Sequence, residues 1–256
     1  MSFACRIEDN IVIFSFNNGK VNSITQETLE GMERMIDRLN NEEELKGLVL
    51  TGTGKYFSGG FDLGTFTSFA SAQEIVNWFK IEEEVLYKLF TCSKPVVAAV
   101  NGHATAAGMI VSMACDYRII LNNPKIKLGM TEIKLGLALS PAEAEIMKFG
   151  LDTDKKYRDV VLGGELFDPV YSVNREIFDE LVEDEAELLS KAKAKVCAMI
   201  DHPGRAFIGL KFMEKKQSAA IIREGIDTFD WNILVDLFTN DEVVNTLKMV
   251  KQALGA

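Results

Sequence analysis

The chain has 256 residues, of which 47% are hydrophobic and 26% charged, a composition typical of one large globular domain or of one domain with an appendage. Its formal net charge of −10 argues against a nucleic acid as the main partner, because proteins that bind nucleic acids carry an excess of Lys and Arg. A local group of basic residues could still hold a small phosphorylated ligand.

Membrane, secretion and metal signals are absent from the sequence. No apolar run is long enough to span a membrane, so no membrane partner is expected. The N-terminal stretch MSFACRIEDNIVIF carries Arg6, Glu8 and Asp9 where a signal peptide has its apolar segment, which predicts a cytoplasmic protein. The four cysteines are scattered and only His103 and His202 are present, so we predict reduced thiols and no metal site.

Short apolar runs typical of strands alternate with segments of helical periodicity. In chain order, strands are expected at NIVIFSF, LKGLVLTGTG, KPVVAAVNG, YRIIL and KIKLGM. Helices are expected over 25–40, in a stretch ending near Leu89, from the small-residue run NGHATAAG to Cys115, and over 142–150. Thr25 is expected to cap the first helix, with Thr28 unsuited to complete a capping box.

This alternation predicts an α/β fold with a largely parallel sheet that is buried on both faces. The character changes near Asp184, where a charged amphipathic helix begins, and after the break HPG the remainder is helical. We therefore divide the chain into a core at 1–183 and a C-terminal helical region at 184–256, which could cover the core or reach a neighbouring subunit.

Two junctions between a strand and a helix are rich in small residues. FSGGFDL presents the backbone N–H of Phe61 after Gly59 and Gly60, and NGHATAAGM presents the N–H of Ala107 at a helix start. Either junction alone is commonly only a turn, and neither spells a dinucleotide or phosphate-binding loop. Two such N–H groups converging on one oxygen would form an oxyanion hole.

Acidic residues follow the next strand. Glu132, in KLGMTEIKLGLALSP, is expected at the end of a short strand, either facing solvent or as a desolvated base with a raised pKa. Glu143 and Glu145 follow Pro141 at a helix start, where capping is the better interpretation and a second acid the alternative. His103 is expected to be a structural or pocket-wall residue rather than a base.

The chain resembles the crotonase superfamily, the enoyl-CoA hydratase/isomerase proteins. The motifs NGKVNSIT, FSGGFDL, PVVAAVNGHATAAG, CDYRI and LGMTEIKLGL occur in the family's order over most of the first 170 residues. The resemblance implies a crotonase (ClpP/crotonase-like) spiral of ββα units with a C-terminal helical region. It also implies an acyl-CoA thioester as ligand, no separate cofactor because coenzyme A is part of the substrate, and a homotrimer or hexamer. The helical region would then serve oligomerisation and cover the pocket.

Residue roles carried over from the resemblance are as follows. The N–H groups of Phe61 and Ala107 would hold the thioester oxygen, and Glu132 would be the acid/base. Ile110 stands where a hydratase carries its first glutamate, so a single-glutamate Δ3,Δ2-enoyl-CoA isomerase is the leading interpretation. Further substrate contacts are expected at Val21, Gly59, Gly60, Asp62, Leu63, Gly108, Ile110, Thr131 and Leu139. The coenzyme A phosphates would meet Lys20, with Arg205, Lys211, Lys215 and Lys216 as further candidates.

Other functions stay open from the sequence. Enoyl-CoA hydration, or another crotonase-type reaction such as thioester or C–C cleavage, is the alternative within enzymes. A non-catalytic acyl-CoA-binding protein is the alternative of another class, and it would have no need of Glu132.

Overall fold

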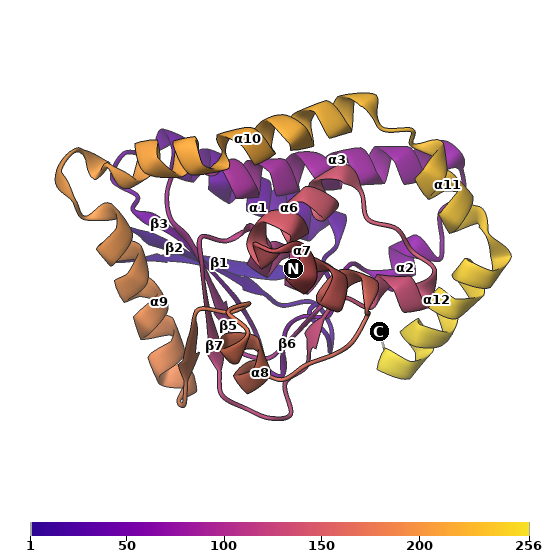
Figure 1. Ribbon diagram of the computed structural model, residues 1–256, viewed down its shortest axis with the longest axis horizontal. Coiled ribbons are helices and arrows are strands. Elements are labelled where there is room, and N and C mark those ends of the chain that lie inside the picture. The colour runs from indigo at the N-terminus through magenta and orange to yellow at the C-terminus, as the bar shows by residue number, and fades with distance from the viewer. Residues whose placement is uncertain (1, 256) are drawn as a thin grey trace.

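The computed structural model describes residues 2–255, and two sheets organise it (Figure 1). The larger sheet has the strand order β1-β2-β3-β5-β7-β9, and the smaller one has the order β4-β6-β8. The strands are β1 Phe3–Glu8, β2 Ile11–Phe16, β3 Gly47–Gly52, β4 Tyr56–Ser58, β5 Val96–Val100, β6 His103–Thr105, β7 Tyr117–Leu121, β8 Leu128–Gly129 and β9 Glu180–Val182.

The helices connect these strands and then complete the chain. They are α1 Gln26–Asn41, α2 Leu63–Phe66, α3 Ala72–Thr91, α4 Ala107–Ala114, α5 Glu132–Leu135, α6 Pro141–Leu151, α7 Asp154–Tyr157, α8 Pro169–Asn174, α9 Glu185–Ile200, α10 Phe207–Thr228, α11 Asn232–Thr239 and α12 Asp241–Leu254. A π-helical turn, Arg158–Leu162, follows α7, and a short 3-10 turn, Pro203–Arg205, precedes α10. None of the helices in this described part of the chain is long and apolar enough to cross a membrane.

The core is a repeating unit of two strands and a helix. Strands β3, β5 and β7 enter the larger sheet side by side and parallel, and each is followed by a strand of the smaller sheet, β4, β6 or β8. A helical segment then returns the chain to the larger sheet. The expected spiral of ββα units and the α/β class are confirmed.

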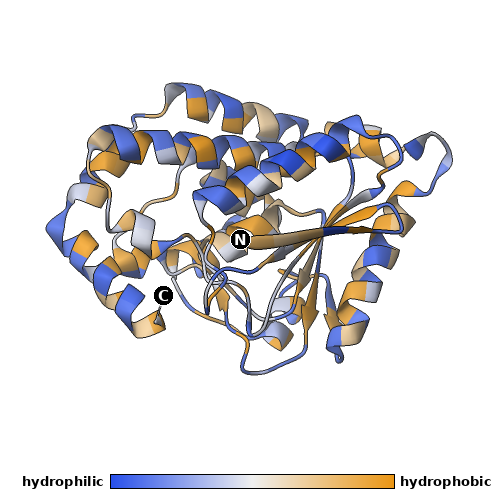
Figure 2. Ribbon diagram, turned by 180° about the vertical axis from the view of Figure 1, so that it is seen from behind, coloured by the Kyte–Doolittle hydropathy of each residue, from blue (hydrophilic) through white to orange (hydrophobic). Residues whose placement is uncertain are grey.

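Both faces of the larger sheet are covered by helices, as its continuous apolar strands require. In β2, Val12 and Phe14 point into the main core with α1 and α3, while Ile11 and Ile13 point to the opposite face. That opposite face packs against α9 through residues such as Val196. Figure 2 shows that the covering helices carry both apolar residues, in orange, and polar residues, in blue.

Three local features differ from the sequence-based expectations. Strand β1 was not expected, yet it pairs antiparallel with β2 and is mostly exposed. Strand β9 was also not expected, and it adds a parallel edge beside β7. The exclusion of a capping box at α1 was wrong, because the Thr28 hydroxyl accepts from Thr25 N at 3.3 Å and Thr25 Oγ1 accepts from Thr28 N.

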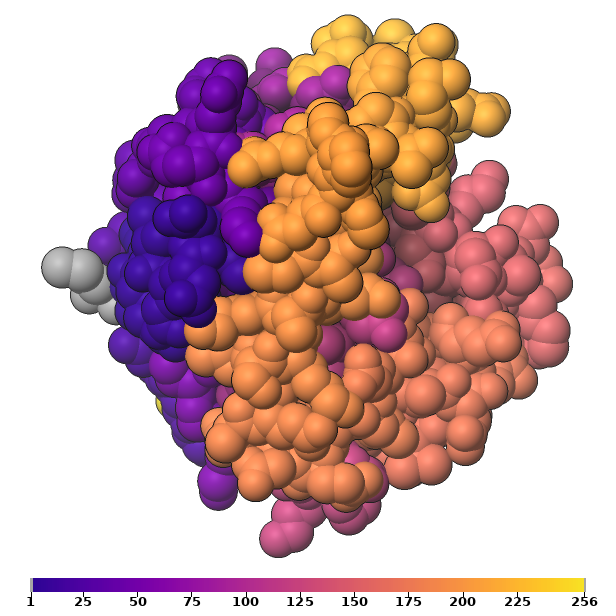
Figure 3. Space-filling view, turned by 90° about the vertical axis from the view of Figure 1, so that its left-hand side faces the viewer, coloured from indigo at the N-terminus to yellow at the C-terminus, as the bar shows by residue number. Residues whose placement is uncertain are grey.

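The C-terminal helices wrap the core on two sides. Helix α10 lies along α3 at the top of Figure 1, and α11 and α12 descend at one end to contact α3, α2 and α5. Figure 3 shows α9 and α10, in orange, covering the middle of the adjoining face. The last helices thereby come to the same end of the molecule as the loops that follow β4 and β8.

Candidate functional site

A cavity of about 340 Å³ lies where the smaller sheet meets the C-terminal helices. Its wall comes from the β4–α2 loop, β6, α5 and the loop after it, α11 and α12. The residues that line it are Tyr56, Gly59, Phe61, Leu63, Phe66, Phe79, His103, Thr105, Ala106, Lys127, Thr131, Glu132, Leu135, Leu137, Ala138, Glu143, Leu166, Phe238, Val250 and Leu254. A largely apolar wall with a few polar groups is typical of a small-molecule site.

The two small-residue loops meet at the edge of this cavity. Gly60 has a φ of +113°, and a Cβ there would lie 2.8 Å from the Ala106 Cβ and 3.5 Å from the Ala107 nitrogen. A Cβ on Gly108 would clash with the carbonyl oxygen of Ser58 at the end of β4. The close backbone approach therefore requires glycine at both positions.

The backbone N–H groups of Phe61 and Ala107 are free among the described residues, since neither donates a hydrogen bond there. Phe61 is held on both sides by Ile24, which donates to Gly60 O at 2.8 Å and accepts from Asp62 N at 3.0 Å. Ala107 begins α4 after Ala106, whose φ of 54° is rare for a residue with a Cβ. Both N–H groups are thus held in place by the local backbone conformation.

Glu132 is the first residue of α5, not the last of a strand as expected, because β8 ends at Gly129. Its side chain lines the cavity, and its Oε2 is buried without a hydrogen-bond partner among residues 2–255. Burial raises the pKa of Glu132 to about 7, and the charge of Glu143 adds to this rise. A carboxyl with this proton affinity can both take and return a proton near neutral pH.

Glu143 lies on the same cavity wall, at the start of α6. Its Oε2 accepts from Ser140 N at 2.8 Å, which completes a capping box, and burial raises its pKa to about 7. The expectation that Glu143 caps the helix is therefore confirmed. Behind it, Glu83 accepts from Ser140 Oγ at 2.5 Å and from Ala142 N at 3.0 Å.

Aromatic rings form the apolar part of the wall. Phe238 of α11 packs edge-on against Phe66 of α2, with ring centroids 4.8 Å apart, and lies 5.2 Å from the Phe79 ring of α3. Phe61 and Phe66 both pack edge-on against Trp78 at 4.8 Å. Helices α2, α3 and α11, which are far apart in sequence, thus close this part of the cavity.

Comparison with known proteins identifies the family. The model of the enoyl-CoA hydratase/isomerase family matches residues 6–245. The chain belongs to the enoyl-CoA hydratase/isomerase family. It is 26% identical over 245 residues to human mitochondrial enoyl-CoA delta isomerase 1, covering 95% of this chain and 80% of that one. It is 24% identical over 188 residues to a probable enoyl-CoA hydratase of Bacillus subtilis, covering 73% of this chain and 72% of that one.

A solved structure supports the same assignment. The crystal structure of human mitochondrial Δ3-Δ2-enoyl-CoA isomerase superposes with a TM-score of 0.90 and 25% identity, covering 100% of this chain and 98% of that one. The crotonase fold and membership among enoyl-CoA hydratase/isomerase enzymes, with isomerases among the similar proteins, are therefore confirmed.

Some of the residues expected at the site line the cavity and others do not. Gly59, Phe61, Leu63, Thr131 and Glu132 line the cavity. The other expected contacts, which lie outside that lining, are Val21, Gly60, Asp62, Ala107, Gly108, Ile110 and Leu139.

For several of these residues, contacts within the protein explain why they lie outside the cavity lining. Ile110 is 1% exposed inside α4, and Val21 packs over Gly59 with its O accepting from Gly59 N at 2.8 Å. Asp62, expected to contact the substrate, instead caps α2 by accepting from Thr65 N at 2.7 Å.

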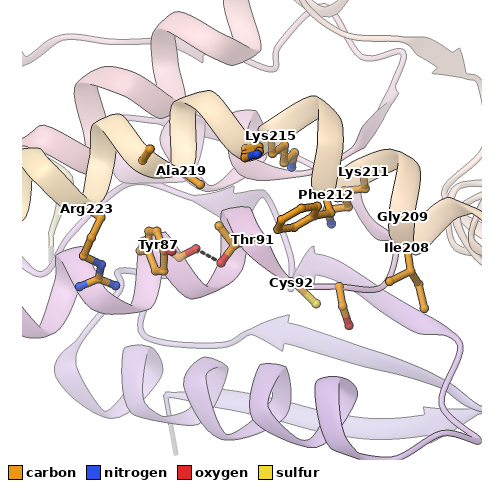
Figure 4. Close-up of a pocket in the computed structure, with 13 residues that line it drawn as sticks. Tyr87, Thr91, Cys92, Ile208, Gly209, Lys211, Phe212, Lys215, Ala219 and Arg223 are labelled. Atoms are coloured by element: carbon orange, nitrogen blue, oxygen red, sulfur yellow. Dashed lines mark hydrogen bonds between the residues drawn. The ribbon is translucent and has the colours of Figure 1, made fainter.

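Basic residues at the site differ from those expected. Lys20 Nζ donates to Leu254 O at 3.3 Å, next to the cavity rim. Lys211 and Lys215, considered for the coenzyme A phosphates, are instead buried and paired with Asp116 at 2.6 and 2.9 Å. They line a separate hollow between α3 and α10 (Figure 4).

The sequence did not predict that Lys127 and the aromatic rings of Phe66, Phe79 and Phe238 line the cavity. Lys127 lines the cavity and its N–H donates to His103 Nδ1 at 3.0 Å, while the His103 ring lies 4.6 Å from that of Tyr56. The alternating KIKLGM pattern could have indicated an outward-facing Lys127. Phe79 has the helical spacing of ordinary core residues, and nothing local distinguishes it.

Proposed function

We propose that this protein isomerises 3-enoyl-CoA thioesters to 2-enoyl-CoA thioesters. The observation that carries the proposal is Glu132, a carboxyl with a pKa of about 7 and a buried, unpaired Oε2, set in a largely apolar cavity. The similar human isomerase supports it. A protein that only binds acyl-CoA would have no use for such a base.

In this proposal, the N–H groups of Phe61 and Ala107 form the oxyanion hole. They donate to the thioester oxygen, where negative charge accumulates when the C2 proton is removed, and so stabilise the enolate. Ala107 opens α4, so the positive end of the helix dipole adds to the favourable field.

Glu132 transfers the proton. Its carboxylate takes one proton from C2, and the C2 electron pair forms the enolate. The enolate then re-forms the thioester carbonyl, its C1–C2 electron pair becomes the C2–C3 double bond, and the electron pair of the former C3–C4 double bond takes the proton back from Glu132 at C4. The proton balance closes without water and without a separate cofactor, since coenzyme A belongs to the substrate.

Hydration of 2-enoyl-CoA is the second candidate. Ile110 is buried and apolar where the resemblance places a hydratase glutamate, which disfavours it. Glu143 favours it, because a second carboxyl on the same wall as Glu132 could help to hold a water molecule.

One assay decides between these functions. Purified protein is given 3-enoyl-CoA and, separately, 2-enoyl-CoA, and the products are separated chromatographically. Turnover of 3-enoyl-CoA to 2-enoyl-CoA with little 3-hydroxyacyl-CoA supports isomerisation. Predominant 3-hydroxyacyl-CoA would favour hydration, and tight binding with no turnover of either would support a non-catalytic binder.

We also propose a homotrimer or a hexamer that contacts its copies through α10, and a cytoplasmic location. On α10, Leu210, Phe212 and Met213 are 70%, 63% and 66% exposed, an unusual apolar surface for a monomer. Beside them lies the hollow of about 700 Å³ between α3 and α10, with Phe212 pointing over it (Figure 4).

Light scattering after size exclusion tests the assembly. The proposal expects a mass of three or six chains, reduced by Phe212→Asp and unaffected by a charge change on α12 such as Lys248→Glu. A monomeric wild-type protein would contradict it. Cell fractionation tests the location.

A further inference from the structure

Four glutamates with buried carboxyl oxygens lie at or behind the cavity. Glu82 and Glu83 of α3 are both 0% exposed, Glu143 of α6 is 5% exposed, and Glu132 of α5 has one buried oxygen. Within residues 2–255, none of the four has a salt-bridge partner. Buried carboxyls without cations must be hydrogen-bonded or protonated.

Two of these carboxyls are held at the N-terminus of α6. Glu143 accepts from Ser140 N, and Glu83 accepts from Ser140 Oγ and Ala142 N. N–H donors at a helix start favour the charged form of a carboxyl. Glu82 has no hydrogen-bond partner for either oxygen, which favours its neutral form.

Glu143 shares the cavity wall with Glu132 and is held by the Ser140 N–H, which favours its charged form and opposes the burial that raises its pKa to about 7. We propose that Glu143 is a positioning residue that acts through Glu132: its negative charge, fixed by Ser140 N–H, favours the protonated form of Glu132 and makes Glu132 a stronger base. The kinetic consequence rests on the proposed isomerisation, whereas the electrostatic effect does not.

The other charged groups around Glu132 and Glu143 do not account for the raised proton affinity of Glu132. Glu82 and Glu83 face Glu143 from α3, and Tyr157 of α7 is affected by the Glu143 charge. Lys134, on the same helix as Glu132, pairs outward with Glu165 at 3.5 Å. His103 and Lys127 lie on the same cavity wall. Of these groups, Glu143 is the one whose charge raises the pKa of Glu132.

Glu143→Gln isolates the charge, because a glutamine oxygen can still accept from Ser140 N and keep the capping box. The Glu132 side-chain carboxyl is followed by ¹³C NMR against pH and assigned by its loss in Glu132→Gln. We expect its titration midpoint in Glu143→Gln to fall by about half a pH unit or more. Glu145→Gln is the matched control, since Glu145 lies on the same helix outside this cavity, and it should leave the midpoint unchanged.

A second variant completes the test. Glu143→Asp, which restores a charge, should return the midpoint toward the wild-type value.

The titration midpoint of Glu132 tests the effect of Glu143, and the kinetics test the proposed isomerisation. For an active enzyme, Glu143→Gln should move the acid limb of the kcat/KM profile to lower pH. An identical Glu132 midpoint in wild type and folded Glu143→Gln would overturn the inference. An inactive wild-type protein with the expected midpoints would overturn only the proposed isomerisation.

Discussion

At the scale of single residues, Glu132 combines a buried oxygen, a place in the cavity and an unusually high proton affinity. Each follows from its position at the start of α5, where the chain turns away from β8 and carries the side chain under the C-terminal helices. Solvation cannot stabilise its charge there, and so the pKa rises to about 7.

Glu132→Gln tests this residue directly. Glutamine keeps the size of the side chain but cannot accept the C2 proton, so we expect kcat for 3-enoyl-CoA to fall by about 10²–10⁴-fold. The dissociation constant for acyl-CoA, measured by calorimetry, should change little. Glu145→Gln serves as the control with normal turnover. A Glu132→Gln enzyme that turns over like wild type would rule out the proposed mechanism.

Gly108 sets the distance between α4 and β4. A Cβ there meets the Ser58 carbonyl oxygen, which a backbone shift must relieve. We expect Gly108→Ala to lower the free energy of unfolding by about 1–3 kcal/mol and to reduce kcat, because the shift displaces the neighbouring Ala107 N–H. Urea denaturation and the isomerase assay measure the two effects.

Gly209→Ala is the control for that substitution. Gly209 also lies in a helix, but a Cβ there has open space. Its replacement should raise the free energy of unfolding by about 0.5–1 kcal/mol, since alanine favours helix. A loss of stability in Gly209→Ala equal to that in Gly108→Ala would show that close packing is not the cause.

At the scale of secondary-structure elements, α11 closes the cavity through Phe238. Phe238→Leu removes ring atoms that contact Phe66 and Phe79. We expect the ratio of kcat/KM for longer over shorter 3-enoyl-CoA chains to increase, and the free energy of unfolding to fall by about 1–3 kcal/mol. Kinetics with a series of acyl chain lengths provides the measurement.

Phe229→Leu is the matched control. Its ring packs on Trp231 at 5.2 Å, outside the cavity lining. It should lower stability without changing the chain-length preference. An unchanged preference in Phe238→Leu would mean that α11 does not limit the acyl chain.

The elements that the sequence predicts well are those specified by local pattern. The segment from β5 to α4 could be placed because an apolar run, a small-residue loop and a helix follow one another within 21 residues, from Lys94 to Ala114. Strand β1 could not, because its mostly exposed residues lack the apolar run and β2 supplies its pairing. Phe238, Val250 and Leu254 join the site only through the return of α11 and α12, which no local pattern encodes.

At the scale of the whole molecule, the buried glutamates make stability depend on pH. Their folded pKa values, about 7 for Glu83, Glu132 and Glu143, lie above the ordinary 4.5 of an exposed glutamate. The folded state therefore binds more protons than the unfolded state between these values, and the contribution of these groups to stability falls as pH rises through that window.

Glu82→Met tests this dependence. It replaces a fully buried carboxyl, whose pKa burial raises well above 4.5, by an apolar side chain of similar length. We expect the free energy of unfolding at pH 8 to rise by about 1–3 kcal/mol, with a smaller gain at pH 5, where the wild-type carboxyl is protonated. Denaturation at both pH values measures it. A gain independent of pH would point to packing instead.

The buried contact between α10 and the core bears on how the chain matures during synthesis. Lys211 and Lys215 reach Asp116, which follows β5 and precedes β7 and also accepts from Val96 N at 2.8 Å. A ribosome releases α10 late, when the strands that position Asp116 have already emerged. The surface that we propose for subunit contact can therefore form only after the larger sheet has folded. Subunit assembly would then select correctly folded chains.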